Sequence, residues 1–191
     1  MEKNQPRRVT WFWWLVFLAL IVGITLLASR VGPIRSKAHL SQPGLYSINR
    51  FIDGDTIAVN MNGSVEIVRM IGVDTPETHK PNTPVQCYGE AAAIYTKNLI
   101  DGSNVRLQAD PLNTNRDRYG RLLRYVYLPD NTLVEEKLIK NGYGFAYTQF
   151  PFEKTDQFVA NEQTAKSSGV GLWSTCNVIV ESRGREQTSY K

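Results

Sequence analysis

Carboxylates and arginines occur together in three short segments of this chain. The segments are residues 53–56, 69–78 and 116–121. Hydrolysis of a phosphodiester requires both residue types. A water molecule must be deprotonated and aimed, and cations must meet the negative charge that develops on the phosphate oxygens. The three segments are therefore candidates to form one site that cuts nucleic acid.

Each segment also has a purely structural interpretation. Asp-Gly-Asp at residues 53–55 is a common turn sequence, and Asp74 or Thr75 can cap a helix or turn that begins at Pro76. Arginines between residues 116 and 124 fit a solvated loop and strand edge. Each segment alone favours the structural interpretation, and only their combination points to catalysis.

The charge of the chain does not by itself identify a nucleic-acid-binding surface. The net charge is +4 and the pI is about 9.1. Between Gly44 and Cys176, however, 13 Lys and Arg stand against 15 Asp and Glu, so the excess lies in the terminal regions. A local cluster of cations must carry any recognition of phosphate.

Residues 9–29 contain no charged side chain. At about 1.5 Å per residue a helix of this length spans roughly 30 Å, the thickness of the hydrocarbon core of a bilayer. Trp11, Trp13 and Trp14 lie at its start, where aromatic rings favour the headgroup layer. The segment predicts a transmembrane anchor. The alternatives are a signal peptide cleaved near residues 27–29 (Leu-Ala-Ser) and a buried core helix.

Residues 1–8 are then a short N-terminal tail and residues 30–43 a proline-containing linker. Whether the apolar segment is retained or cleaved, the rest of the chain is exported if the N-terminus stays inside the cell. We expect an extracytoplasmic domain, either anchored to the membrane or secreted.

The pattern of residues 44–176 predicts one α+β domain. Five short strands of this kind suit a small closed barrel. Residues 177–191 end polar and charged and predict a flexible tail. The expected strands are residues 45–52, 56–61, 65–71, 105–109 and 122–128, with a hairpin turn at 61–64, and the expected helices are residues 90–99, 133–140 and 156–168.

The chain has two cysteines, Cys87 and Cys176. In an exported protein such a pair predicts a disulfide, and the alternative is two free buried thiols. Closing a loop of this length stabilises the fold by roughly 4–5 kcal/mol in the chain-entropy model.

The order and spacing of these groups resemble the staphylococcal nuclease (thermonuclease) family. The resemblance runs from about residue 45 to residue 174 and includes residues 88–89 (Tyr-Gly) and 171–174 (Gly-Leu-Trp-Ser). It implies a five-stranded OB-fold barrel with about three helices, here preceded by one transmembrane helix, and a calcium-dependent nuclease that accepts DNA and RNA. The residues that carry it are Asp55, Arg69, Asp74, Thr75, Glu77, Asp117, Tyr119 and Arg121.

The resemblance also implies roles for the residues of the site. Asp55 and Asp74 would be carboxylate ligands of Ca²⁺, and Thr75 would add its backbone carbonyl. Hard oxygen ligands suit Ca²⁺. Arg69 and Arg121 would grip the scissile phosphate as planar guanidinium forks. Glu77 would orient or deprotonate the attacking water, although a metal ion could supply much of that activation.

Substrate contacts are implied outside the chemical step. Asp117, Arg118 and Tyr119 lie in the third segment, and Arg118 stands where a lysine would reach a terminal phosphate. Tyr119 and Tyr147 fall where tyrosines lie near the nucleotide, and bases stack on such rings without sequence preference. For Tyr147 the alternative is an ordinary aromatic residue in an apolar loop.

Two departures from the family pattern concern phosphate and base contacts. The loop at residues 81–86 (Pro-Asn-Thr-Pro-Val-Gln) lacks the lysines often found there, and Gln149 replaces a second expected tyrosine. The cysteines are also additions. A bond between them would tie the loop that bears Glu77 to the C-terminal end of the domain.

We therefore expect a calcium-dependent, largely sequence-nonspecific endonuclease that acts on DNA, RNA or both. It would be a monomer attached to the membrane by its N-terminal helix, with no protein partner. The alternatives are a non-catalytic nucleic-acid-binding OB-fold module displayed at the membrane and a membrane protein whose domain docks a partner. Three carboxylates argue against a pure binder, because without a cation they repel a polyanion.

Overall fold

The computed structural model describes residues 13–21, 44–78, 84–181 and 184–190. The chain divides into two units, Met1–Ser36 and Lys37–Lys191. In the first unit residues 13–21 are helical. No helix among the described residues is long and apolar enough to span a bilayer. The predicted tail 1–8, the linker 30–43 and the remainder of the predicted span 9–29 lie outside the described residues.

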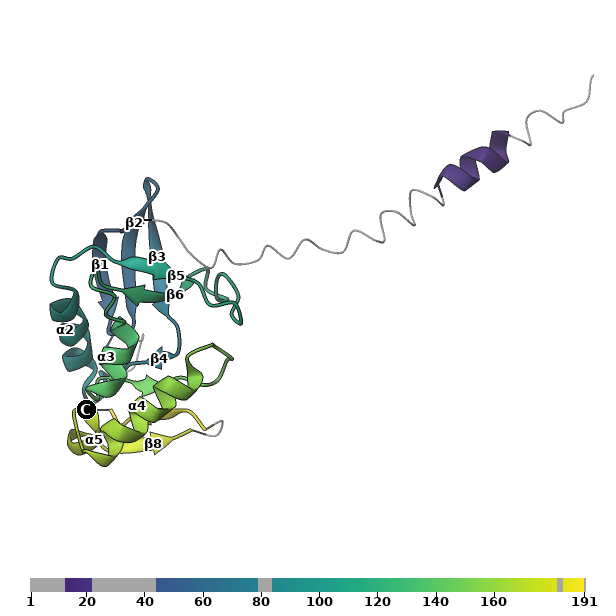
Figure 1. Cartoon of the computed structure of the whole chain (residues 1–191). Helices are drawn as coiled ribbons and strands as arrows, with labels where there is room; N and C mark the ends of the chain where they lie inside the picture. The colour runs from purple at the N-terminus through teal and green to yellow at the C-terminus, as the bar shows by residue number, and fades with distance from the viewer. Residues whose placement is uncertain (1–12, 22–43, 79–83, 182–183, 191) are drawn as a thin grey trace, which may run out of the picture. The chain divides into compact units, whose positions relative to one another are not determined.

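The second unit is built on a sheet with the strand order β1-β2-β3-β6-β5 (Figure 1). All neighbouring strands are antiparallel except β3 and β6, which are parallel. Tyr46 and Val105 exchange two backbone hydrogen bonds of 2.8 and 2.9 Å, so the chain before β1 meets the chain before β5. The sheet therefore closes on itself, as predicted. The strands are β1 (Ile48–Asp53), β2 (Thr56–Met61), β3 (Ser64–Met70), β5 (Arg106–Gln108) and β6 (Leu122–Tyr127).

Strand β2 and its partners form the apolar interior. Ile57, Val59, Val68, Leu107 and Val126 are fully buried. Val68 in β3 and Leu107 in β5 alternate with more exposed positions, which is the period-2 pattern of a strand with one buried face. Burying such a side chain stabilises the fold by roughly 1.5–3 kcal/mol.

Helices pack beside the barrel and gather at one end of it (Figure 1). The three predicted helices form, with slightly different ends: α2 (Gly89–Ile100), α3 (Val134–Lys140) and α4 (Thr155–Ser167). The predicted hairpin turn also forms, because Asn62 and Gly63 take positive φ angles of 51° and 82°. Within the predicted domain, residues 44–176, three short elements were not predicted: β4 (Val73–Asp74), β7 (Phe145–Ala146) and α5 (Leu172–Thr175).

The prediction of a flexible tail at residues 177–191 is wrong for most of that segment. Strands β8 (Val178–Val180) and β9 (Glu186–Thr188) pair as an antiparallel hairpin. Contacts distant in sequence hold it. The Cys87 backbone N–H donates to the Ser189 carbonyl (2.8 Å), and the Thr188 hydroxyl donates to the Cys87 carbonyl (2.7 Å). The folded domain therefore extends beyond the predicted boundary at residue 176.

The predicted disulfide is present. Cys87 and Cys176 are bonded across a separation of 89 residues. The bond joins the loop before α2 to the end of α5, next to the start of β8. It therefore fixes the C-terminal hairpin to the part of the chain that follows Glu77.

Candidate active site

Arg69 lies at the centre of the candidate site. Its Nη2 lies 2.9 Å from Asp74 Oδ1 and 3.1 Å from Asp55 Oδ2, so one nitrogen is shared by two carboxylates. Its Nη1 donates to the backbone carbonyls of Met70 (2.8 Å) and Val73 (2.7 Å). Burial opposes the charge of this guanidinium, but Asp55 and Asp74 outweigh it and raise the pKa of Arg69.

Sheet pairing brings these residues together. Arg69 on β3 is the register partner of Thr56 on β2, which directly follows Asp55. Asp74 is positioned by β4, which pairs with β7. Asp55 Oδ2 also accepts the Thr75 backbone N–H at 2.9 Å. The first two sequence segments, residues 53–56 and 69–78, therefore form one cluster.

This cluster fits a divalent cation with hard ligands. The carboxylates of Asp55 and Asp74 already share one cationic nitrogen, so they are close enough to share a cation of another kind. Both residues are buried, and Thr75 Oγ1 beside them is buried with no hydrogen-bond partner in the described part of the chain. No group of three or more His, Cys, Asp or Glu with the spacing of a metal site occurs among residues 13–21, 44–78, 84–181 and 184–190.

Gly54 allows this close arrangement. A Cβ at this position would lie 2.7 Å from Thr75 Oγ1. Any larger residue would push the Asp53–Asp55 turn away from Thr75, so the turn sequence noted above has a packing function as well.

Glu77 faces the same group of acids. Its pKa is raised to about 7, first because it is partly buried and then because Asp55, Asp53 and Asp74 are nearby. The Glu77 backbone N–H donates to Gln86 Oε1 (2.7 Å), and its carbonyl accepts from the Gln86 backbone N–H (3.0 Å). Gln86 is adjacent to the disulfide, so the backbone of Glu77 is fixed from that side.

The third segment forms a second cluster. Asp117 Oδ2 accepts from Arg121 Nε at 2.7 Å, and its Oδ1 accepts the backbone N–H groups of Tyr119 and Arg121. Arg118 donates to the Tyr119 hydroxyl at 2.6 Å, and the Arg121 guanidinium carbon lies 5.3 Å from the centre of the Tyr119 ring. Burial alone would raise the pKa of Asp117, but Arg121 lowers it below its ordinary value.

Parallel pairing relates the two clusters. Arg69 on β3 is the register partner of Leu123 on β6, and Arg121 precedes Leu123 by two residues. The two predicted phosphate-gripping arginines thus lie at the ends of adjacent strands, Arg69 near the end of β3 and Arg121 just before the start of β6. Arg69 is held by Asp55 and Asp74, and Arg121 is held by Asp117.

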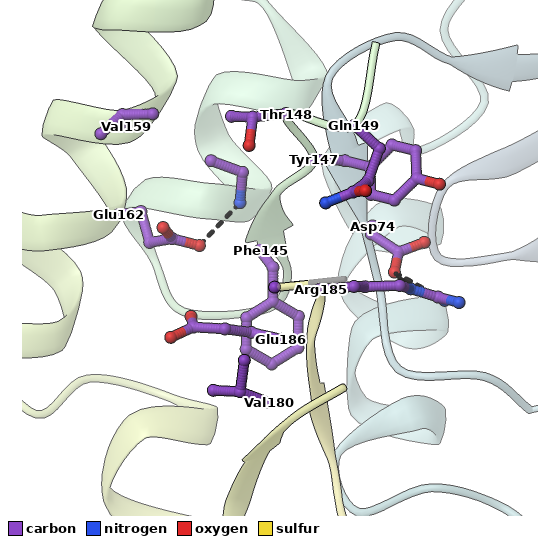
Figure 2. A pocket seen from close by; sticks show the side chains of 12 residues that line it. Asp74, Phe145, Tyr147, Thr148, Gln149, Val159, Glu162, Val180, Arg185 and Glu186 are labelled. Carbon is purple, nitrogen blue, oxygen red and sulfur yellow. Dashed lines mark hydrogen bonds and ion pairs between the residues drawn. The ribbon is translucent and has the colours of Figure 1, made fainter. Parts of the chain in front are cut away.

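Tyr147 borders a cavity of about 290 Å³ beside Asp74 (Figure 2). Its backbone N–H donates to the Gly72 carbonyl at 2.8 Å. The opposite wall is formed by the β8–β9 hairpin, from which Arg185 reaches Asp74 (Figure 2). Arg185 Nε and Nη2 lie 2.9 and 2.8 Å from Asp74 Oδ2.

Three residues of this region were missed by the sequence analysis. Asp53 accepts hydrogen bonds from Gly54 and Thr78 and lies beside Glu77. It could have been noticed as the other acid of the Asp-Gly-Asp turn. Gln86 and Arg185 carried no local signal, because their contacts join segments that are distant in sequence.

Comparison with known proteins gives a consistent result. Residues 67–175 match the family model described as staphylococcal nuclease homologue. The chain is 38% identical over 160 residues to a thermonuclease of Staphylococcus intermedius, covering 83% of this chain and 94% of that protein. It is 46% identical over 140 residues to the SPbeta prophage-derived endonuclease YokF and 47% identical over 135 residues to the endonuclease YncB, both of Bacillus subtilis. These matches cover 72% and 70% of this chain but only 46% and 63% of the two Bacillus proteins.

Proposed function

The chain belongs to the staphylococcal nuclease family, and from this premise we propose that it is a metal-dependent endonuclease that hydrolyses phosphodiester bonds of DNA or RNA. One observation carries the proposal. Arg69 is shared by the buried carboxylates of Asp55 and Asp74, with Glu77 beside them. Nucleases and thermonucleases are the named relatives, and this cluster combines the cation and the acids that their chemistry requires.

We propose Ca²⁺ as the metal, held by the carboxylates of Asp55 and Asp74 and the backbone carbonyl of Thr75. Oxygen donors of this kind are those that Ca²⁺ prefers. A divalent cation bound there supplies Lewis-acid polarisation of the phosphate and lowers the pKa of a bound water.

In this proposal the side chains of the protein carry out proton transfer, phosphate stabilisation and substrate binding. Glu77 accepts a proton from the attacking water. Arg69 and Arg121 donate to the phosphate oxygens, where negative charge grows as the bond breaks. Asp117 holds the Arg121 side chain so that less conformational freedom is lost when the substrate binds. Arg118, Tyr119 and Tyr147 contact the flanking nucleotides.

We further propose that the domain acts outside the cytoplasm, with residues 9–29 as a membrane anchor or as a cleaved signal. The Cys87–Cys176 bond supports this location, because structural disulfides persist mainly in oxidising compartments.

Cleavage of plasmid DNA by the purified full chain tests the proposal. We expect nicking and linearisation with Ca²⁺ and none with EGTA. Arg121→Ala should lower kcat by about 10²–10³, the value of one donor to a transition-state charge. Arg106→Ala is the matched control, because Arg106 contacts Gln108, Tyr127 and Asn131 and, within the described part of the chain, no residue of the site.

Two outcomes contradict parts of the proposal. Undiminished cleavage in EGTA excludes the calcium requirement. Binding of DNA without cleavage under any divalent metal indicates the alternative function, a non-catalytic nucleic-acid-binding module.

A further inference from the structure

We propose that Arg185 binds a phosphate of the nucleic-acid substrate next to the scissile one, so that the β8–β9 hairpin forms one wall of the substrate cleft. This inference rests on the proposed nuclease function. It assigns a role to a segment that lies beyond residues 67–175, the part of the chain that matches the family model.

The position of the guanidinium is the first argument. Asp74 lies between two arginines, with Oδ1 paired to Arg69 and Oδ2 paired to Arg185. A phosphate held at Arg185 is therefore on the other side of Asp74 from one held at Arg69. Successive phosphates of one strand can occupy two such places.

The hairpin holds Arg185 in this place firmly. Cys87 forms one hydrogen bond with the Ser189 carbonyl and one with the Thr188 hydroxyl. In addition, Gln86 Nε2 donates to Gln187 Oε1 (3.1 Å). Lys166 on α4 pairs with Glu186 on β9 at 2.9 Å. The disulfide ends two residues before β8. Because the chain is anchored both before β8 and along β9, little conformational entropy is lost when Arg185 binds a ligand.

The cavity beside Arg185 is suited to a nucleotide unit. It measures about 290 Å³ and lies between the hairpin and Tyr147 (Figure 2). The Arg185 guanidinium carbon lies 5.9 Å from the centre of the Tyr147 ring. An aromatic face for a base beside a cation for a phosphate is the usual combination in single-strand recognition.

The guanidinium is also accessible to a ligand. Its side chain is 31% exposed, whereas that of Arg69 is 13% exposed. Nε and Nη2 both contact a single oxygen of Asp74, so a small rotation exchanges one of these contacts for a phosphate oxygen. Guanidinium groups match two phosphate oxygens, which favours this exchange over simple release into water.

Binding of a fluorescent single-stranded oligonucleotide in EDTA, over a series of KCl concentrations, tests the inference without turnover. For Arg185→Ala we expect Kd to rise roughly tenfold. The slope of log K against log salt should fall by about 0.7, the value of one phosphate contact on a single strand. Arg185→Lys keeps the charge and should retain the slope. Arg106→Ala, with the same change in net charge, should match the wild type.

A double-mutant cycle separates a direct contact from an effect through Asp74. In an Asp74→Asn background, Arg185→Ala should still raise Kd and lower the slope. With Ca²⁺ present, Arg185→Ala in the otherwise wild-type chain should change KM far more than kcat. An effect that vanishes in the Asp74→Asn background would overturn the inference, since Arg185 would then act only through that carboxylate.

The same data distinguish this inference from the proposed function. If the wild type neither binds nor cleaves nucleic acid, the nuclease proposal fails and this inference fails with it. If the wild type does both and Arg185→Ala behaves identically, only the role of Arg185 is refuted.

Discussion

Removing the disulfide should have a large and calculable effect on stability. The Cys87–Cys176 bond joins residues 89 apart, and the chain-entropy model for a loop of this length gives about 4.5 kcal/mol. The double variant Cys87→Ser/Cys176→Ser should lose about this free energy of unfolding. In a domain of this size the loss lowers Tm by on the order of 10 °C.

Urea unfolding of the double variant and of the wild type measures the loss. The wild type treated with a phosphine reductant provides an independent route, and its unfolding free energy should fall by a similar amount. Cleavage at low temperature should persist, because the backbone N–H of residue 87 still donates to the Ser189 carbonyl and its carbonyl still accepts from the Thr188 hydroxyl. A loss below about 1 kcal/mol would refute the reasoning, since the unfolded chain would then gain almost no freedom from opening the loop.

Three further predictions concern the site and its support. Arg69→Lys should lower kcat by roughly 10² and leave the circular dichroism spectrum unchanged. The reason is that an ammonium cannot reproduce the contacts of the guanidinium with two carboxylates and two carbonyls. Near-normal rates would exclude Arg69 from the chemistry. Because the pKa of Glu77 is raised from 4.5 to about 7, the metal-free wild type should lose stability as pH rises through that window. Glu77→Gln should remove this loss of stability. The test compares the urea midpoints of unfolding of both proteins in EDTA, at one pH below the window and one above it. If the midpoints of the two proteins depend equally on pH, the raised pKa is contradicted. Gly142→Ala should cost about 2 kcal/mol or more, since its φ is +70° and a Cβ would clash with the Val170 carbonyl. Gly63→Ala, with φ +82° and open space, should cost less, and equal losses in thermal unfolding would show that the clash is relieved.

The sequence by itself determined the features that depend on local chemistry. The first strands of the barrel follow from segments rich in Val and Ile between turn signals, and the β2–β3 turn follows from Asn62-Gly63, because hairpin turns need positive φ. The acids and arginines of the candidate site were likewise visible as residue types in three segments. The family match over residues 67–175 agrees with the stated resemblance.

Only the tertiary structure decided which of these groups meet. Strands β4 and β7 have two residues each, too few for a periodic signal, yet their pairing positions Asp74. The segment that carries Arg185 is polar, and its local pattern predicted a tail. It is ordered by contacts with Cys87 and with Asp74, the latter 111 residues away in the chain. Such contacts form only when closure of a long loop is offset by packing and hydrogen bonds elsewhere, and no local pattern of residues encodes that balance.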